Sequence, residues 1–446
     1  MFSKSKPFKF SRSGTKLACG LLCWVFAMIV IRQALANYHF DHPQDSQAVH
    51  EREELHSKLL SNPISSAHLR YCNTNGTYFD TNWSCPSNHY YLEQLIVINR
   101  HGTRESVNTG AANWNEHCKS KKEKICTYTY TYIIKRAIKS NGLDLHAASS
   151  YRKDKQHLCL TKAGLVQVRS VASHVKRYSA LCHGDFVNVI QASQTALLSS
   201  SANRAFDTVA EFVQVFLGSG MYRISIAEPA GDIFQPWLVC SRRNATNLIG
   251  WINHQLSKAK LWETFSVGRK HLCDTIQTKL TSKDCLDLTE NVMMPICNEM
   301  NNLTLGLDST QIEAMFQMYE EFHEHLFKSP KASITAKKLV APMLHKIREI
   351  IGKKHEFKLV IIGAHDFTLA HFFASLNMDN WHWPFLASNT LIEVLRDVRT
   401  NQIFLRFLQD GKVLSEMSLL LFEMATNWAI PLRSWTCPQL YRVSKT

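Results

Sequence analysis

Short apolar runs and amphipathic stretches alternate along most of the chain. Residues 95–98 and 359–362 are apolar and rich in β-branched side chains, which is typical of strands buried on both faces of a parallel sheet. Residues 391–395 and 403–408 alternate apolar and polar positions like an antiparallel pair, and a turn is expected at residues 409–411. At 446 residues the chain is long enough for one large or two medium domains.

Apolar positions three and four residues apart predict the helices. One helix is expected to begin at Thr161, whose hydroxyl suits the N-cap position, and another begins at Arg204. Two longer helical patterns cover residues 310–327 and 335–351. Residues 186–199 are apolar and rich in strand formers, so a strand is predicted before Arg204.

Two further segments invite a functional interpretation. His323 and His325 lie two residues apart and do not share a helix face, so exposed histidines are expected rather than a metal site. Residues 381–384, with the sequence WHWP, either wall a pocket or pack in the core.

The N-terminal segment has the pattern of an export signal. Residues 1–16 carry five basic side chains and no acid, which predicts a cytosolic basic tail. Residues 17–31 are apolar and uncharged, and an extension to residue 36 is long enough for a signal-anchor transmembrane helix. Cleavage after Ala36 is the alternative. Both interpretations place the rest of the chain in a secretory compartment.

Residues 37–90 are polar and include three prolines, which predicts a lumenal stem before a body at residues 91–446. Of the thirteen cysteines, eleven lie outside the predicted anchor, in scattered positions without the paired spacing of a zinc site. Several disulfides are expected, and the odd number leaves one thiol free or bridging two chains. Four glycosylation sequons, at Asn75, Asn82, Asn244 and Asn302, agree with a lumenal body.

Two segments of the body look like insertions. Residues 108–158 are polar and basic, and residues 221–308 have low periodicity, so we expect them to form a helical cap. The net charge of +14 favours anionic partners.

The first strand ends in the segment RHGTR, which places Arg100, His101 and Arg104 at the carboxyl end of a strand. Ligands bind at this edge of open α/β sheets. A neutral imidazole can attack phosphorus and hold the phosphoryl group covalently. Guanidinium groups match phosphate oxygens and disfavour an imidazolium beside them. The segment therefore predicts phosphoryl transfer through His101.

The second apolar run ends in a His-Asp pair, His365 and Asp366. His365 adds a phosphate donor, and the Asp366 carboxyl can protonate a leaving alcohol. The structural alternatives are a core histidine and a helix N-cap.

Together the two motifs resemble the histidine acid phosphatase family, whose pattern is R-H-G-x-R-x-P early and a small residue before H-D late. Residues 160–167, with the sequence LTKAGLVQ, resemble the family's L-T-x-x-G-x-x-Q helix start. Residues 199–204 resemble the segment that supplies its third phosphate-binding arginine, here Arg204. The resemblance runs from about residue 92 to about residue 408. It implies an α/β fold, a mostly parallel sheet with helices on both faces and an inserted helical cap, and the strand ends agree with it.

The resemblance also implies roles for the site residues. His101 would be the nucleophile and Asp366 the proton donor, and no cofactor or metal is expected. Substrate-binding groups would be supplied by Arg100, Arg104, Arg204 and His365. One departure concerns loop stiffness: the family proline is Ser106 here, preceded by Glu105.

Within the family, the anchor, the stem and the basic body resemble a Golgi branch that removes phosphate from xylose in the glycosaminoglycan–protein linkage region. We therefore expect a single-pass type II Golgi membrane protein with a lumenal body, a phosphorylated glycan or other phosphomonoester as partner, a possible homodimer and no nucleic acid. A lysosomal or secreted acid phosphatase of broad specificity, and a catalytically inactive relative that binds phosphoglycans, are the alternatives.

Overall fold

The computed structural model describes residues 67–73, 84–104, 160–184, 186–218, 222–227, 231–236, 239–240, 293–294, 296–298, 309–328 and 330–435. All of them belong to one of the two compact units of the chain, Ser66–Thr446. The predicted anchor, the sequons, Glu105, Ser106 and nearly all of the predicted cap lie outside the described residues. Among the helices that are described, none is long and apolar enough to cross a membrane.

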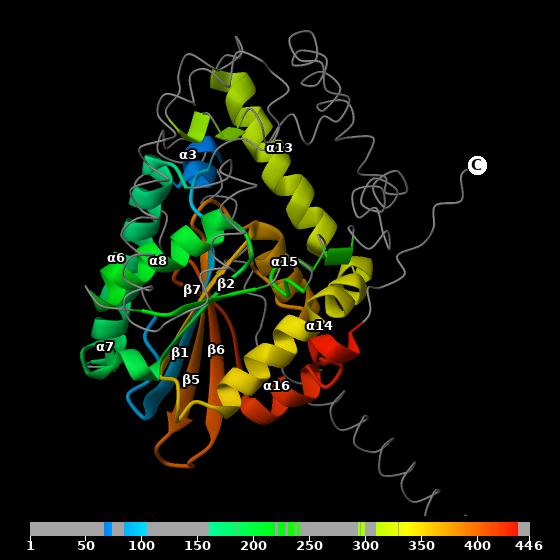
Figure 1. The fold of residues 1–446 in the computed structure, drawn as a ribbon. Coiled ribbons are helices and arrows are strands. Elements are labelled where there is room, and N and C mark those ends of the chain that lie inside the picture. The colour runs from blue at the N-terminus through cyan, green and yellow to red at the C-terminus, as the bar shows by residue number, and fades with distance from the viewer. Residues whose placement is uncertain are drawn as a thin grey trace, which may run out of the picture. The chain divides into compact units, whose positions relative to one another are not determined.

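A seven-stranded sheet forms the centre of the described part (Figure 1). Its order is β3-β2-β4-β1-β5-β6-β7. The strands are β1 Tyr90–Arg100, β2 Thr195–Ser199, β3 Ile224–Ile226, β4 Leu359–Ala364, β5 Asn389–Asp397, β6 Ile403–Gln409 and β7 Lys412–Ser418. The pairs β2–β3, β2–β4 and β1–β4 are parallel, and the pairs β1–β5, β5–β6 and β6–β7 are antiparallel.

The sheet is therefore mixed, and the expectation of a mostly parallel sheet is corrected. The strands predicted around residues 95–98, 359–362, 391–395 and 403–408 are confirmed, as is the turn, where Asp410 and Gly411 adopt positive φ values. The antiparallel half arises because β5, β6 and β7 follow one another through short connections, which favour antiparallel neighbours.

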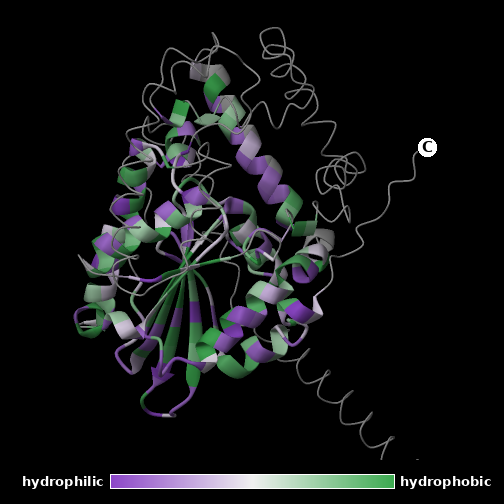
Figure 2. Ribbon diagram, viewed as in Figure 1, coloured by the Kyte–Doolittle hydropathy of each residue, from purple (hydrophilic) through white to green (hydrophobic). Residues whose placement is uncertain are grey.

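Helices cover both faces of the sheet, as predicted (Figure 1). On one face, α6 Lys162–His183 and α8 Asn203–Leu217 pack against the side chains of Leu95 and Val97. On the other face, α13 Ser309–Lys328, α14 Pro330–Gly352, α15 Asp366–Ser375 and α16 Leu419–Ala425 share a core with Ile96 and Ile98. Figure 2 shows strands that are mainly hydrophobic and helices that carry both colours, as expected for a sheet buried between two helical layers.

Several local predictions can be compared with these elements. Thr161 caps α6, because its side chain accepts a hydrogen bond from the Gly164 backbone N–H. The strand expected at residues 186–199 occupies only the end of that range. Its first part forms the short helix α7, Phe186–Val189, followed by a 3₁₀ turn at Ala192–Gln194.

The predicted exposure of His323 is wrong. The residue is 5% exposed, its Nδ1 donates to the Tyr319 carbonyl at 2.7 Å, and its ring lies 4.3 Å from that of Trp383. His325 is exposed, as expected. Trp381 and Trp383 are buried in the core. Aromatic packing between α13 and the WHWP segment outweighs the polarity of His323, whose pKa burial lowers to about 4.

A buried charged network ties α6 to the antiparallel half of the sheet. The Glu393 carboxylate on β5 accepts hydrogen bonds from Tyr178 Oη and His183 Nε2, each at 2.6 Å, and from Arg406 Nη1 at 3.1 Å. Burial opposes the charge, but these partners outweigh it and hold the pKa of Glu393 below its usual value. The disulfide between Cys85 and Cys182 lies beside His183 in sequence. Because Glu393 and Arg406 are register partners in the middle of β5 and β6, this network links α6 to the centre of the antiparallel half.

Candidate active site

Strand register brings the two predicted motifs together. Arg100, the last residue of β1, is the register partner of Ala364, the last residue of β4. The next residues, His101 and His365, therefore leave neighbouring parallel strands at the same edge of the sheet. Their ring centroids lie 5.3 Å apart in an edge-to-face arrangement, and both side chains are almost completely buried. The spatial convergence predicted from two motifs far apart in the sequence is confirmed.

One ring nitrogen of His101 is hydrogen-bonded to the backbone of its own loop. Nδ1 lies 2.9 Å from the carbonyl oxygen of Gly102, and a carbonyl can only accept, so Nδ1 carries the ring proton. The lone pair of the neutral ring is then on Nε2. Burial and the charges of Arg204 and the neighbouring groups lower the pKa of His101 well below its usual value. The ring is thus held in the neutral, nucleophilic form.

Arg100 is the most enclosed charge of the site. Its guanidinium donates to the Tyr71 hydroxyl at 2.8 Å and to the Pro384 carbonyl, and it forms an ion pair with Asp366 at 2.8 Å. Burial alone would lower the pKa of Arg100, but Asp366 and the tyrosines outweigh it and raise that pKa. The contact places the Asp366 carboxyl, at the start of α15, beside a guanidinium at the sheet edge.

The other two arginines come from different elements. Arg104 ends the RHGTR loop and pairs with Leu160 through an isolated antiparallel bridge. Arg204 is the second residue of α8, the helix that follows β2 after a three-residue connection. The charges of both act on His365 as well as on His101, and with burial they lower the pKa of His365 well below its usual value. All six predicted site residues thus lie at one edge of the sheet.

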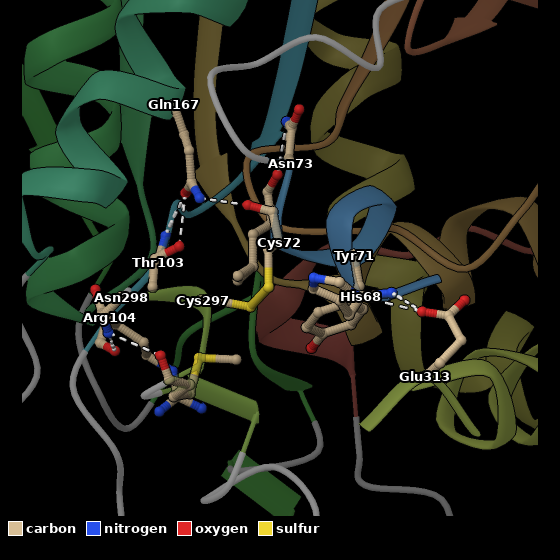
Figure 3. The surroundings of a disulfide bond; sticks show 12 residues. His68, Tyr71, Cys72, Asn73, Thr103, Arg104, Gln167, Cys297, Asn298 and Glu313 are labelled. Atoms are coloured by element: carbon tan, nitrogen blue, oxygen red, sulfur yellow. Dashed lines mark hydrogen bonds and ion pairs between the residues drawn. A yellow bond between two sulfur atoms is a disulfide. The ribbon is translucent and has the colours of Figure 1, made fainter. Parts of the chain in front are cut away.

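The RHGTR loop is fixed from two sides (Figure 3). On one side, Gln167 Oε1 accepts from the Thr103 backbone N–H at 2.7 Å and from its hydroxyl at 2.8 Å, while Gln167 Nε2 donates to the Cys72 carbonyl. On the other side, Asn298 Nδ2 donates to the Arg104 carbonyl at 3.2 Å. Figure 3 shows that the Cys72–Cys297 disulfide joins the two sides.

Several residues of the site carried no signal in the sequence. Tyr71 lies on α3, Ala67–Cys72, within the stretch predicted as a stem, yet its hydroxyl and ring contact Arg100. Gln235 and Ser200 both contact His365 Nε2, and Ser200 is bonded to Asp232. Tyr71, Gln235 and Asp232 are single polar residues outside the motifs, whereas Ser200 lies inside the segment 199–204, in which only Arg204 was singled out. Only the folded chain brings these residues to the site. Gln167 could be found, because it belongs to the L-T-x-x-G-x-x-Q pattern.

No family model and no curated protein matches the sequence. Solved structures do match the fold. The apo form of Hafnia alvei phytase has a TM-score of 0.54 and 11% identity, over 77% of this chain and 98% of that one. Citrobacter braakii phytase has a TM-score of 0.52 and 12% identity, over 76% of this chain and 98% of that one. Klebsiella sp. ASR1 phytase has a TM-score of 0.52 and 13% identity, over 79% of this chain and 99% of that one. The chain therefore has the fold of these phytases.

Proposed function

We propose that the protein is an acid phosphatase, a phosphate monoester hydrolase that works through a phosphohistidine on His101. The observation that carries this proposal is the meeting of two buried, neutral imidazoles from adjacent strand ends with three arginines whose charges act on both rings. Guanidinium groups stabilise the charge that spreads over the oxygens during phosphoryl transfer. The fold of the phytases and the resemblance to histidine acid phosphatases support the same chemistry.

The proposed reaction assigns one role to each group of the site. His101 Nε2 attacks phosphorus, the ester oxygen leaves, and Asp366 donates a proton to that oxygen. Arg100, Arg104, Arg204 and His365 hold the phosphoryl oxygens. Water then attacks the phosphohistidine, Asp366 takes the proton of the water, and inorganic phosphate is released with His101 regenerated. Asp366 must enter the cycle protonated, and not as the carboxylate that pairs with Arg100 in the empty site. The proton that it gives to the leaving oxygen is recovered from the attacking water, so the cycle balances.

Trapping of the intermediate tests the nucleophile. The full-length protein is mixed with a ³²P-labelled phosphomonoester and quenched rapidly under alkaline conditions, where phosphohistidine survives. Label should be bound to the wild-type protein and absent from the His101→Ala variant. Wild-type protein that turns over substrate without ever carrying label would contradict the covalent mechanism.

The proton donor is tested by the leaving group. Asp366→Asn should slow hydrolysis of an alkyl phosphate far more than that of p-nitrophenyl phosphate, because nitrophenolate leaves without a proton. Equal losses on both substrates would count against the acid role of Asp366.

For the natural substrate, we propose xylose phosphate in the glycosaminoglycan–protein linkage region. The support is the layout of the sequence, with its predicted anchor, its stem and a basic body suited to an anionic glycan. The assay compares a phosphoxylose glycopeptide with phytate, because the matching structures are phytases, and with simple phosphoesters. A preference in kcat/KM for the glycopeptide supports the proposal, and similar values for all of them favour a broad-specificity acid phosphatase.

The same sequence features support a single-pass type II Golgi protein with a lumenal body. Protease protection in intact microsomes and co-localisation with a Golgi marker test this placement. An inactive relative that binds phosphoglycans is the remaining alternative, and binding of the phosphoxylose glycopeptide without turnover would favour it.

A further inference from the structure

The short helix α3 precedes the sheet in the sequence and lies within the stretch predicted as a stem, yet it is built into the body. The Glu313 carboxylate on α13 accepts from the backbone N–H groups of Ala67 and His68, and it also contacts His68 Nδ1 at 3.3 Å (Figure 3). Just after α3, Asn73 Nδ2 donates to the Leu386 carbonyl at 2.9 Å. Both ends of this segment are therefore held by the body.

Tyr71 is the residue of α3 that reaches the site. Its side chain is fully buried, and its ring lies 5.4 Å from that of Phe316 and 5.6 Å from that of Tyr319, both on α13. Its backbone carbonyl accepts from Leu386 N at 3.1 Å. Because the ring and the backbone are both fixed, the hydroxyl has a defined position, 2.8 Å from Arg100 Nη2.

The guanidinium of Arg100 has acceptors at both of its terminal nitrogens. Nη1 donates to the Pro384 carbonyl. Nη2, which has two N–H groups, lies 2.8 Å from Tyr71 Oη and 2.8 Å from Asp366 Oδ2. Nε is also buried, but it has no acceptor among the described residues. A buried donor is costly unless an acceptor meets it, so the Nε–H is suited to an oxygen of a bound phosphoryl group.

The acceptors around Arg100 differ in whether they change during the reaction. Asp366 is a carboxylate when it pairs with Arg100 in the empty site, and it is neutral when it enters the cycle. The attraction between the two groups weakens at that stage, because a neutral carboxyl accepts less strongly than a carboxylate. The Tyr71 hydroxyl and the Pro384 carbonyl take no part in the proton transfers and accept from Arg100 throughout.

We propose that Tyr71 is a positioning residue for Arg100: its hydroxyl holds the guanidinium in place while Asp366 gains and loses its proton, so that the Nε–H stays in position to donate to the phosphoryl group. The end of the predicted stem is then part of the active site. The role in turnover rests on the proposed phosphatase function, whereas the role in binding a phosphate ion does not.

The test removes the hydroxyl and keeps the ring. In the full-length protein, Tyr71→Phe retains the packing on Phe316 and Tyr319 but takes one acceptor away from Arg100. We expect kcat/KM on an alkyl phosphate to fall about tenfold, since a hydrogen bond to a charged group is lost. Binding of inorganic phosphate, measured by calorimetry, should weaken by about the same factor.

Two control variants separate the hydroxyl from the packing of α3. Tyr222→Phe should leave both measurements unchanged, because its hydroxyl donates to the Gly218 carbonyl near the start of β3, whereas the site lies at the ends of the parallel strands. Arg70→Met removes the ion pair between α3 and Glu320 on α13 but keeps the Tyr71 hydroxyl. A loss in Arg70→Met as large as that in Tyr71→Phe would make α3 merely structural and overturn the proposal.

A double-mutant cycle shows whether Tyr71 acts through Arg100. In the Arg100→Met background the hydroxyl has no guanidinium to hold, so adding Tyr71→Phe should lower kcat/KM and phosphate affinity no further. A loss by the same factor in both backgrounds means that Tyr71 acts independently of Arg100, which overturns the proposal. If Arg100→Met does not fold, the comparison with Arg70→Met decides alone.

The outcomes separate the two proposals. A wild-type protein that hydrolyses phosphomonoesters, with a Tyr71→Phe variant that is equally active and binds phosphate equally well, refutes the positioning role alone. A wild-type protein that binds inorganic phosphate more tightly than Tyr71→Phe but turns over no phosphomonoester refutes the proposed function and leaves the positioning role standing. A wild-type protein that neither binds phosphate nor turns over a phosphomonoester refutes both.

Discussion

The contact between Gly102 in the RHGTR loop and Gly164 in α6 allows the sharpest prediction, because it sets the distance between this loop and the helix. A Cβ added at Gly102 would lie 2.5 Å from the Gly164 carbonyl oxygen. A Cβ added at Gly164 would lie closer than 3.0 Å to the Thr103 carbonyl oxygen. Both obstructions are backbone atoms, which cannot move aside as a flexible side chain does. Gly164→Ala should therefore push the loop away from the helix.

Two opposing effects determine how Gly164→Ala changes the stability of the protein. Alanine in place of glycine within a helix is worth about 1 kcal/mol in favour of folding. Ordinary van der Waals contact begins near 3.4 Å, so the loop must shift by roughly 1 Å. Since the same loop carries His101, a shift of this size in a reacting group costs on the order of 100-fold in rate. We expect kcat/KM to fall about 100-fold, while stability changes by only about 1–3 kcal/mol.

The assay measures kcat/KM on p-nitrophenyl phosphate together with thermal unfolding. Gly352→Ala is the matched control, because Gly352 also lies in a helix and no atom would come within 4 Å of its new Cβ. It should leave activity unchanged and stability equal or slightly higher. If Gly164→Ala is as active as Gly352→Ala, the close packing of the two backbones does not position the nucleophile, and this reasoning is refuted.

Three further predictions concern charge and cross-links. Because burial and Arg204 lower the pKa of His101, the nucleophile stays neutral in acid, and Arg204→Gln should move the acid limb of kcat/KM to higher pH in a pH–rate profile. Replacing Cys72 and Cys297 together by serine should cost about 2–5 kcal/mol in urea unfolding and lower kcat, whereas unchanged kcat would exclude a brace on the loop. The lowered pKa of Glu393 stabilises the fold above about pH 4.3 and this stability is lost as pH falls, so Glu393→Gln should cost about 3–5 kcal/mol near pH 7 and flatten the acid dependence of thermal unfolding.

Much of the fold could be predicted because its signals are local. The apolar runs of β1 and β4 stand out from their polar surroundings, and each ends in a compact group of reactive residues. The rule that the carboxyl ends of such strands share an edge then predicts that the two groups converge, but the neighbouring positions of β1 and β4 and the register of Arg100 with Ala364 come only from the structure. The N-cap of α6 could likewise be predicted from Thr161 and the few residues that follow it.

The rest depends on partners that are far apart in the sequence. The antiparallel pairing of β5 with β1 inserts a later strand beside an earlier one, and no local pattern indicates that choice. Tyr71, Ser200 and Asp232 are single polar residues, and only their contacts in the folded chain connect them with the site. His323 was predicted to be exposed because it does not share a helix face with His325 and a metal site was therefore not expected, but the aromatic rings around it make a buried position favourable.

Ser106 stands where the pattern of the histidine acid phosphatases, which the sequence resembles, has a proline, so the RHGTR loop needs another source of stiffness. Proline acts locally, by fixing one backbone angle. In the described part of the loop the constraint comes from hydrogen bonds at successive residues. The His101 carbonyl accepts from Ala387 N at 3.0 Å, the Thr103 carbonyl accepts from Thr161 N at 3.0 Å, and the Arg104 carbonyl accepts from Asn298. Each partner belongs to a different segment, so the loop can shift only if several contacts break together. Stiffness of this kind does not require a proline, and it makes the position of His101 depend on the packing of the whole sheet edge.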